Sequence, residues 1–156
     1  MPNWTYNNVQ FVGKTEDSVK QLKDLLKSKD NDFDFNNVIP MPLALTETVS
    51  GSENAKPEWQ KEQSEKLKKH HGFDNWYDWS IMNWGTKWNA CDTNVELNKN
   101  VLSYTFDTAW DAPREIAKAL LHMRNTILKD ISIEWNCVHE DGNEEEELIR
   151  DGDVYE

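Results

Sequence analysis

Two strand-and-helix units, one toward each end of the chain, restrict the fold more than any other feature of this sequence. The segment WTYNNVQFVG mixes aromatic and β-branched residues and stops at Gly13, which predicts a strand over about 4–12. Thr15 can cap a helix N-terminus, and apolar residues at helical spacing follow it to about residue 29. In the second unit, a helical stripe over 116–127 precedes a strand over 131–135.

Further elements are expected between and around these units. Residues 33–39 are rich in aromatic and β-branched side chains and predict a second strand, which the prolines of PMP end. Residues 46–57 have the composition of an exposed loop. Helices are expected from Glu58 to about His70 and over about 75–83. The segment NVELNKNVLSYTF divides into two strands, which predicts a hairpin.

The resulting order is β-α-β, a helical and aromatic insert, then β-β-α-β with an acidic end. Such an order predicts an α+β fold, a ferredoxin-like split β-α-β sandwich with an antiparallel sheet and helices on one face. A length of 156 residues is typical of one domain. We therefore expect a single domain over 1–156, with a helical, Trp-rich insert at about 46–88 and an acidic hairpin or tail at about 140–156.

Tryptophan is concentrated in the expected insert, where four of the eight tryptophans lie between Trp76 and Trp88. Only 37% of the residues are hydrophobic, so large aromatic side chains must supply much of the core. Trp84, Lys87 and Trp88 in the segment NWGTKWNA are nevertheless binding candidates. In one interpretation this segment packs into the core where the chain turns from a helix into a strand, with Trp84, Thr86 and Trp88 on one face of that strand. The other makes it a surface site.

The negative charge of the chain lies mainly at its C-terminal end. Of the net charge of -12, residues 140–156 hold nine acids and one base, a net of -8, which leaves -4 for the remainder. This balance argues against direct nucleic-acid binding and fits a partner protein with a basic groove. A solvated acidic tail is the alternative interpretation. The acidic binding candidates are Glu144, Glu145, Glu146 and Glu147.

Motifs for catalysis, cofactors or metals are not recognisable in this sequence. There is no Gly-rich phosphate loop, no His-Glu-x-x-His and no nucleophile elbow, so no catalytic residue and no cofactor is expected. Cys137 and His139 share a strand face and could form a metal pair. Without Cys-x-x-Cys or a second close pair, however, the sequence predicts no metal site.

The chain contains no apolar run long enough to span a bilayer and no signal-like start. We therefore expect no membrane association and a cytoplasmic location, with both cysteines reduced. The oligomeric state is not fixed by the sequence.

Four motifs in order along the chain resemble a known family. The opening MPNWTYNNVQFVG is similar to a Pro-Asn-Trp-Cys-x-Asn start, and FNNVIPMP, NWGTKWNA and YTFDTAWDAP match its later motifs. These motifs are typical of the YubB or Api-type ferredoxin-like domains of phages and plasmids, a family of unknown function. The resemblance implies a ferredoxin-like fold and a mobile-element setting in a bacterial host cell. Thr5 departs from the pattern, which has cysteine there.

Three classes of function are consistent with these observations. The leading hypothesis is a non-enzymatic protein-binding module of a phage or mobile element, an acidic inhibitor or modulator of a host defence or nucleic-acid-handling protein. A single-stranded nucleic-acid-binding domain is the first alternative, because sheets of this type can present aromatic side chains to bases. A small enzyme with a site not visible in the sequence is the second.

Overall fold

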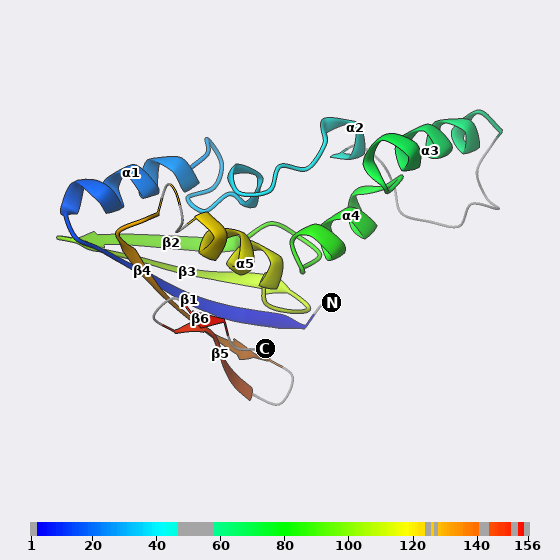
Figure 1. The fold of residues 1–156 in the computed structure, drawn as a ribbon. Coiled ribbons are helices and arrows are strands. Elements are labelled where there is room, and N and C mark those ends of the chain that lie inside the picture. The colour runs from blue at the N-terminus through cyan, green and yellow to red at the C-terminus, as the bar shows by residue number, and fades with distance from the viewer. Residues whose placement is uncertain are drawn as a thin grey trace.

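The computed structural model shows an α+β fold built on one six-stranded sheet of order β2-β3-β1-β4-β5-β6, with antiparallel pairing throughout (Figure 1). It describes residues 3–46, 58–123, 126, 128–140, 144–150 and 153–154. The strands are β1 (Trp4–Gly13), β2 (Cys91–Asn98), β3 (Val101–Ala109), β4 (Ile131–His139), β5 (Glu144–Arg150) and β6 (Asp153–Val154). The helices are α1 (Glu16–Leu26), the 3-10 turn η1 (Phe35–Asn37), α2 (Leu43–Thr46), α3 (Glu58–His71), α4 (Trp76–Asn83) and α5 (Arg114–Met123). The predicted α+β class with an antiparallel sheet is confirmed.

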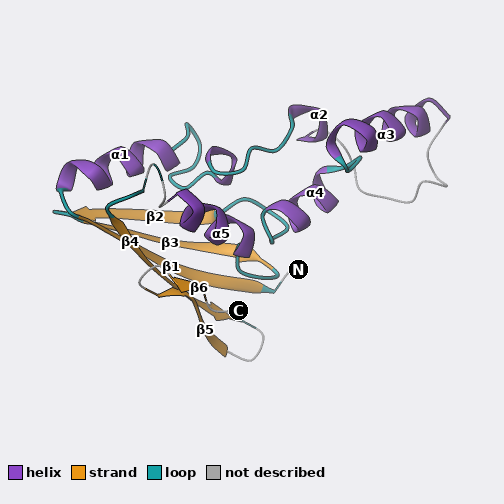
Figure 2. Ribbon diagram, in the orientation of Figure 1, coloured by secondary structure: helices purple, strands orange, loops and turns teal. Residues whose placement is uncertain are grey.

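The sheet has one helix-covered face and one open face. Helices α1 and α5 lie on the same side of the sheet, and β5 and β6 continue the sheet beyond β4 at the bottom of the view (Figure 2). Burial along β1 alternates accordingly: Thr5, Val9 and Phe11 are buried, while Tyr6 and Asn8 are exposed. Helices α3 and α4 project beyond one end of the sheet (Figure 1).

Aromatic rings fill the core between the helices and the sheet. The ring of Phe33 lies at its centre, with centroid distances of 5.0 to 6.2 Å to four other rings. Those rings belong to Phe35, Tyr104, Phe106 and Trp135, all at most 2% exposed. Edge-to-face contacts of this kind add to the free energy gained by burial. The expectation that aromatic residues supply much of the core is confirmed.

The two terminal units form, although the bounds of the second differ from those predicted: α5 covers Arg114–Met123, and β4 continues past residue 135 to His139. The Thr15 side chain accepts a hydrogen bond from the Ser18 backbone N–H and caps α1, which ends at Leu26, slightly before the predicted position. The helices predicted from Glu58 to about His70 and over about 75–83 also form, as α3 and α4. The predicted hairpin is β2–β3, and Lys99 in its two-residue turn has a φ of 54°.

The predicted strand over residues 33–39 is wrong. This segment forms η1 and irregular backbone, although Phe33 and Phe35 are completely buried. Asp34 caps η1 by accepting from the Asn36 backbone N–H, which favours a turn over a ladder. Side chains then replace sheet pairing, because the Asn89 side chain accepts from the Phe35 N–H and donates to Asp34.

The prediction that a strand begins within Trp84–Trp88 is also wrong. Trp84 is the C-cap of α4, and residues 85–89 are irregular up to β2, which begins at Cys91. Gly85 has a φ of 85°, as expected for a residue that ends a helix. The acidic segment at 144–150, in contrast, is strand β5 of the sheet.

The predicted exposed loop at 46–57 lies outside the described residues apart from Thr46. Among the described residues, no helix combines the length and the apolar character needed to cross a membrane.

Candidate acidic groove and its surroundings

A groove of about 800 Å³ runs across the open face of the sheet. Residues from five strands line it, and five of these residues are acidic: Asp92, Asp107, Glu145, Glu146 and Glu147. The uncharged open-face side chains that line it are Tyr6, Asn8, Asn94, Thr105, Asn136 and Val138. No lysine, arginine or histidine is among the described lining residues. The groove is therefore acidic and rich in amides, a surface suited to cationic groups.

The pKa of one groove carboxylate, Asp107, is shifted. Burial, and secondarily the charge of Asp92, raises the pKa of Asp107 above its usual value. Asp92 lies in the β2 bulge with a φ of 50°, a conformation that Asp tolerates better than most residues. A cation placed between these two side chains would relieve this repulsion.

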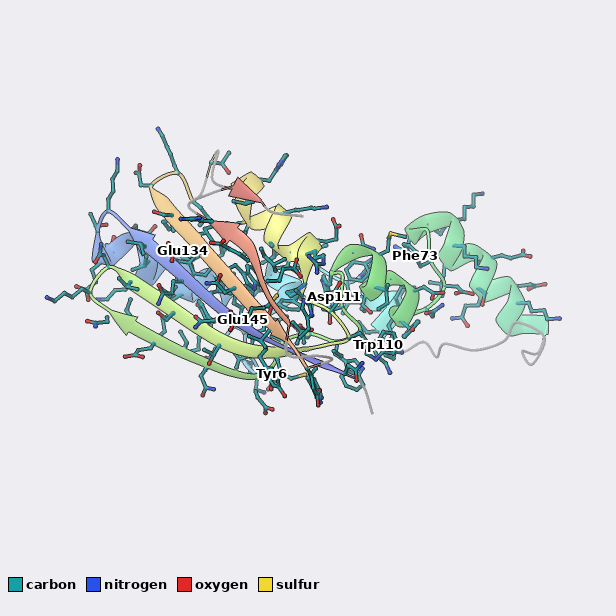
Figure 3. All side chains as sticks on the ribbon, turned by 90° about the horizontal axis from the view of Figure 1, so that it is seen from below. Tyr6, Phe73, Trp110, Asp111, Glu134 and Glu145 are labelled. Carbon is teal, nitrogen blue, oxygen red and sulfur yellow. The ribbon has the colours of Figure 1, made fainter. Side chains whose placement is uncertain are left out.

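The predicted acidic candidates are divided between the two faces of the sheet. Figure 3 views the sheet from the side opposite α1 and α5, with Glu145 labelled on β5. Glu145 and Glu147 line the groove, and Glu147 Oε1 lies 3.8 Å from Nε of Arg150 on the same strand. Glu146 points to the other side and binds Arg114. The side chain of Glu144 is outside the described residues.

Aromatic side chains and Lys87 form a half-exposed cluster near one end of the sheet. Lys87 Nζ lies 4.8, 5.0 and 5.9 Å from the ring centroids of Trp88, Trp110 and Tyr77. The ring of Trp4 lies 6.0 Å from that of Trp88. Figure 3 labels the exposed Trp110, whose backbone has a φ of 78° and donates to Asn3 O. Lys87 thus already occupies the cation position among these rings.

Trp84, the third predicted candidate in this segment, belongs to the core and not to this cluster. It is 4% exposed, and its ring contacts Trp79 and Phe35. The following residues are fixed to the end of β3, because the Thr86 hydroxyl donates to Ala109 O at 2.7 Å. Trp84 therefore has no surface to offer a partner, whereas Lys87 and Trp88 keep part of theirs.

Polar side chains form a compact network on the helix-covered side of β4 and β5. Arg114 at the start of α5 donates to both carboxylate oxygens of Glu146 and to both of Asp111. His139 Nε2 lies 2.9 Å from Glu146 Oε1, and Cys137 Sγ lies 3.8 Å from the same nitrogen. Thr5 Oγ1 lies 3.1 Å from His139 Nδ1.

The electrostatics of this network follow from its charges. The Arg114 guanidinium holds the pKa of Glu146 at about 2, well below its usual range, and His139 acts in the same direction. The two carboxylates raise the pKa of Arg114. Burial, and secondarily the charge of Glu146, raises the pKa of Cys137 to about 12, so the free thiol stays protonated near neutral pH.

The sequence predicted only part of the acidic groove and only part of the polar network around Arg114. It placed Cys137 and His139 on one face and singled out the acids at 144–147, but it missed Asp92 and Asp107 in the groove and Arg114 as the partner of Glu146. The pairing register of β4 and β5 places Cys137 opposite Glu146. This register determines which side chains reach the groove and which reach the Arg114 network. No short-range sequence signal reports that register.

Comparison of the chain with protein-family models, curated proteins and solved structures found no match. Inferences about function therefore rest on the geometry and on the motifs described above.

Proposed function

We propose that this chain is a non-enzymatic binding module of a phage or other mobile element, which binds a basic surface of a host defence or nucleic-acid-handling protein through its acidic groove. The observation that carries the proposal is the open-face groove, in which every charged side chain among the described lining residues is a carboxylate. A groove built to hold phosphates is itself basic, so an acidic surface can compete for it.

The shape of the groove supports a protein segment as the occupant. A space of about 800 Å³ on an open sheet can take several side chains of an extended basic segment. The amides of Asn8, Asn94 and Asn136 can bond to the backbone or to guanidinium groups of such a segment. Tyr6, 47% exposed at the groove wall, offers a ring face to a cation.

The proposal also includes a ferredoxin-like fold and a mobile-element setting for this chain. The order β2-β3-β1-β4, with α1 following β1 and α5 following β3, supports a ferredoxin-like split β-α-β core. The motif resemblance to YubB or Api-type domains supports the mobile-element setting.

A charge-matched pair of variants tests the groove. The groove variant carries Asp92→Asn, Asp107→Asn and Glu145→Gln; the control carries Asp24→Asn, Asp30→Asn and Glu62→Gln at exposed positions elsewhere. Both lose three negative charges and little volume. Binding of an arginine-rich peptide, measured by fluorescence anisotropy, should weaken at least roughly tenfold in the groove variant only, because close charge pairs outweigh distant ones within a Debye length.

The host partner is then sought with the same two variants. Affinity capture from a bacterial lysate should recover a protein that the parent and the control retain and the groove variant loses. Equal weakening of peptide binding in both variants would mean that net charge alone attracts cations, and the groove proposal would fail. Quenching of tryptophan fluorescence by a single-stranded oligonucleotide at low salt would favour the nucleic-acid alternative instead.

A further inference from the structure

Three potential metal ligands lie together on β4 and β5, and two of them, Cys137 and Glu146, are also among the residues that line the acidic groove. Cys137 and His139 are two residues apart on β4 and share a face, and Glu146 lies directly opposite Cys137 on β5. Their donor atoms, Sγ, a ring nitrogen and a carboxylate oxygen, all lie within 4.8 Å of one another. Regular strand geometry thus gathers three donors of different chemistry.

The separations between these donors fit a tetrahedral ion. Ligands bound at about 2.0–2.3 Å from such an ion lie roughly 3.3–3.6 Å from one another. Here Cys137 Sγ lies 3.8 Å from His139 Nε2, and the same nitrogen lies 2.9 Å from Glu146 Oε1. One ring nitrogen therefore faces both other donors, and shifts of a few tenths of an ångström, small on the scale of ordinary side-chain motion, open the space for an ion.

The surrounding residues fix the orientation of the ligands. When Nε2 holds a metal, the ring proton resides on Nδ1, where the buried Thr5 hydroxyl oxygen lies 3.1 Å away and can accept it. Asp111 Oδ1 lies 4.0 Å from Nδ1 and strengthens this preference. Glu146 keeps one oxygen on Arg114 Nη1 while its Oε1 turns from Nη2 toward the ion.

The charges of the cluster balance once a divalent ion is present. A Cys137 thiolate, Asp111 and Glu146 carry three negative charges, and Arg114 together with a divalent ion carries three positive charges. Without the ion, the two carboxylates share the single Arg114 guanidinium. The side chains of His139 and Glu146 are 18% and 26% exposed, which leaves a route for the ion from solvent.

We propose that Cys137, His139 and Glu146 bind one Zn²⁺ ion, with the fourth position open to water or to a side chain of a binding partner. One sulfur, one nitrogen and one oxygen donor suit Zn²⁺, whereas Mg²⁺ and Ca²⁺ require mostly oxygen ligands. Coordination replaces the proton on Cys137 Sγ, which passes to solvent. The bound ion joins β4 to β5.

Titration of the chelator-treated full chain tests the site. Competition with a chromophoric chelator should give one Zn²⁺ per chain, and Co²⁺ should produce a thiolate-to-cobalt charge-transfer band in the near ultraviolet. Cys137→Ser should abolish the band and weaken Zn²⁺ binding at least roughly tenfold, the scale on which even outer-shell changes act. Cys91→Ser, which changes the other thiol, should leave both unaltered.

A second matched pair of variants tests the carboxylate ligand, Glu146. Glu146→Gln should weaken Zn²⁺ binding at least roughly tenfold, while Glu147→Gln, on the opposite face, should not. Circular dichroism of each variant checks its folding, and the Co²⁺ spectrum of the parent chain tests the site even if Cys137→Ser does not fold.

The proposal is overturned if the parent binds no stoichiometric Zn²⁺ and shows no charge-transfer band. It is also overturned if the band survives Cys137→Ser, or if binding instead depends on the adjacent His70 and His71. The acidic-groove proposal is independent of these outcomes, because its test uses peptide binding and variants outside this cluster.

Discussion

The indole Nε1 of Trp84 donates a hydrogen bond to the backbone oxygen of Ile39 at 2.8 Å, across 45 positions of sequence. This bond joins the end of α4 to the irregular segment after η1, and the same ring packs edge-on against Phe35 and Trp79. A side chain with these contacts is part of the core and connects the end of α4 to the segment around η1.

Trp84→Ala should therefore destabilise the protein by about 3–5 kcal/mol, the range for deleting a buried aromatic side chain. Trp84→Phe keeps most of the apolar contacts and loses the hydrogen bond, so its cost should be about 1–3 kcal/mol. Trp88→Ala should cost less than Trp84→Ala because Trp88 is half-buried. Urea unfolding followed by circular dichroism measures all three. Equal costs for Trp84→Ala and Trp88→Ala would contradict this assignment.

Lys87 should stabilise the folded protein measurably, unlike a lysine whose side chain points into solvent. Its ammonium lies within 5.9 Å of three ring centroids, and its side chain is half-buried. Lys87→Met keeps the apolar stem and removes the charge, so its cost estimates the cation–π part, about 0.5–1 kcal/mol. Lys87→Ala should cost more, since the stem is lost as well. Unfolding free energies that match the parent for both variants would refute this role.

Gly85 and Gly72 form a natural comparison of backbone strain with and without a steric contact. Both have positive φ, 85° and 81°. A Cβ at Gly85 would lie 3.0 Å from the Arg114 backbone nitrogen, whereas one at Gly72 would meet nothing within 4 Å. Gly72→Ala should cost about 1 kcal/mol from conformation alone, and Gly85→Ala clearly more. Thermal unfolding that ranks the two variants in the reverse order would contradict the structure.

Tyr104→Phe should leave stability unchanged or raise it by up to about 1 kcal/mol. Tyr104 is completely buried, and within the described part of the chain its hydroxyl oxygen has no hydrogen-bond partner. Removing a buried hydroxyl without a partner removes a desolvation cost and retains the ring contacts with Phe11 and Phe33. Denaturant unfolding decides the sign, and a loss of more than about 1 kcal/mol would reveal an unrecognised partner.

The sequence predicted the elements whose local signals agree with their tertiary environment. Thr15 caps α1, and the burial of β1 alternates as its pattern indicates. The strand prediction for residues 33–39 was wrong because the aromatic residues of this segment are buried in the core without belonging to a strand. Asp34 and Asn89 satisfy its backbone through side-chain hydrogen bonds that strand propensity does not consider.

The two candidate sites were less predictable because they depend on the register between distant strands. The acids at 144–147 formed one block in the sequence. Strand alternation sends Glu145 and Glu147 to the groove and Glu146 to Arg114. A slip of one residue in β5 would exchange these roles, and local sequence contains nothing that fixes the register at this level.

Acid should weaken the protein through the Arg114–Glu146 pair. The pKa of Glu146 is about 2 in the folded chain against an ordinary value of 4.5. Because the folded-state pKa is the lower one, the pair stabilises fully above about pH 4.5, and this contribution is lost as the pH falls through about 2. The difference in unfolding free energy between the parent and Glu146→Gln, measured in urea with a chelator present, should shrink over this range.

Glu145→Gln is the matched control for this titration, because its side chain lies one position away on the open face. Arg114 pairs with Glu146 and Asp111 and not with Glu145, so the loss expected for the Arg114–Glu146 pair should not appear in the difference between the parent and Glu145→Gln. The comparison cancels the titration of the other acidic residues, which parent and variants share. If the Glu146→Gln difference is as flat as that of the control, Arg114 does not stabilise the Glu146 carboxylate in solution.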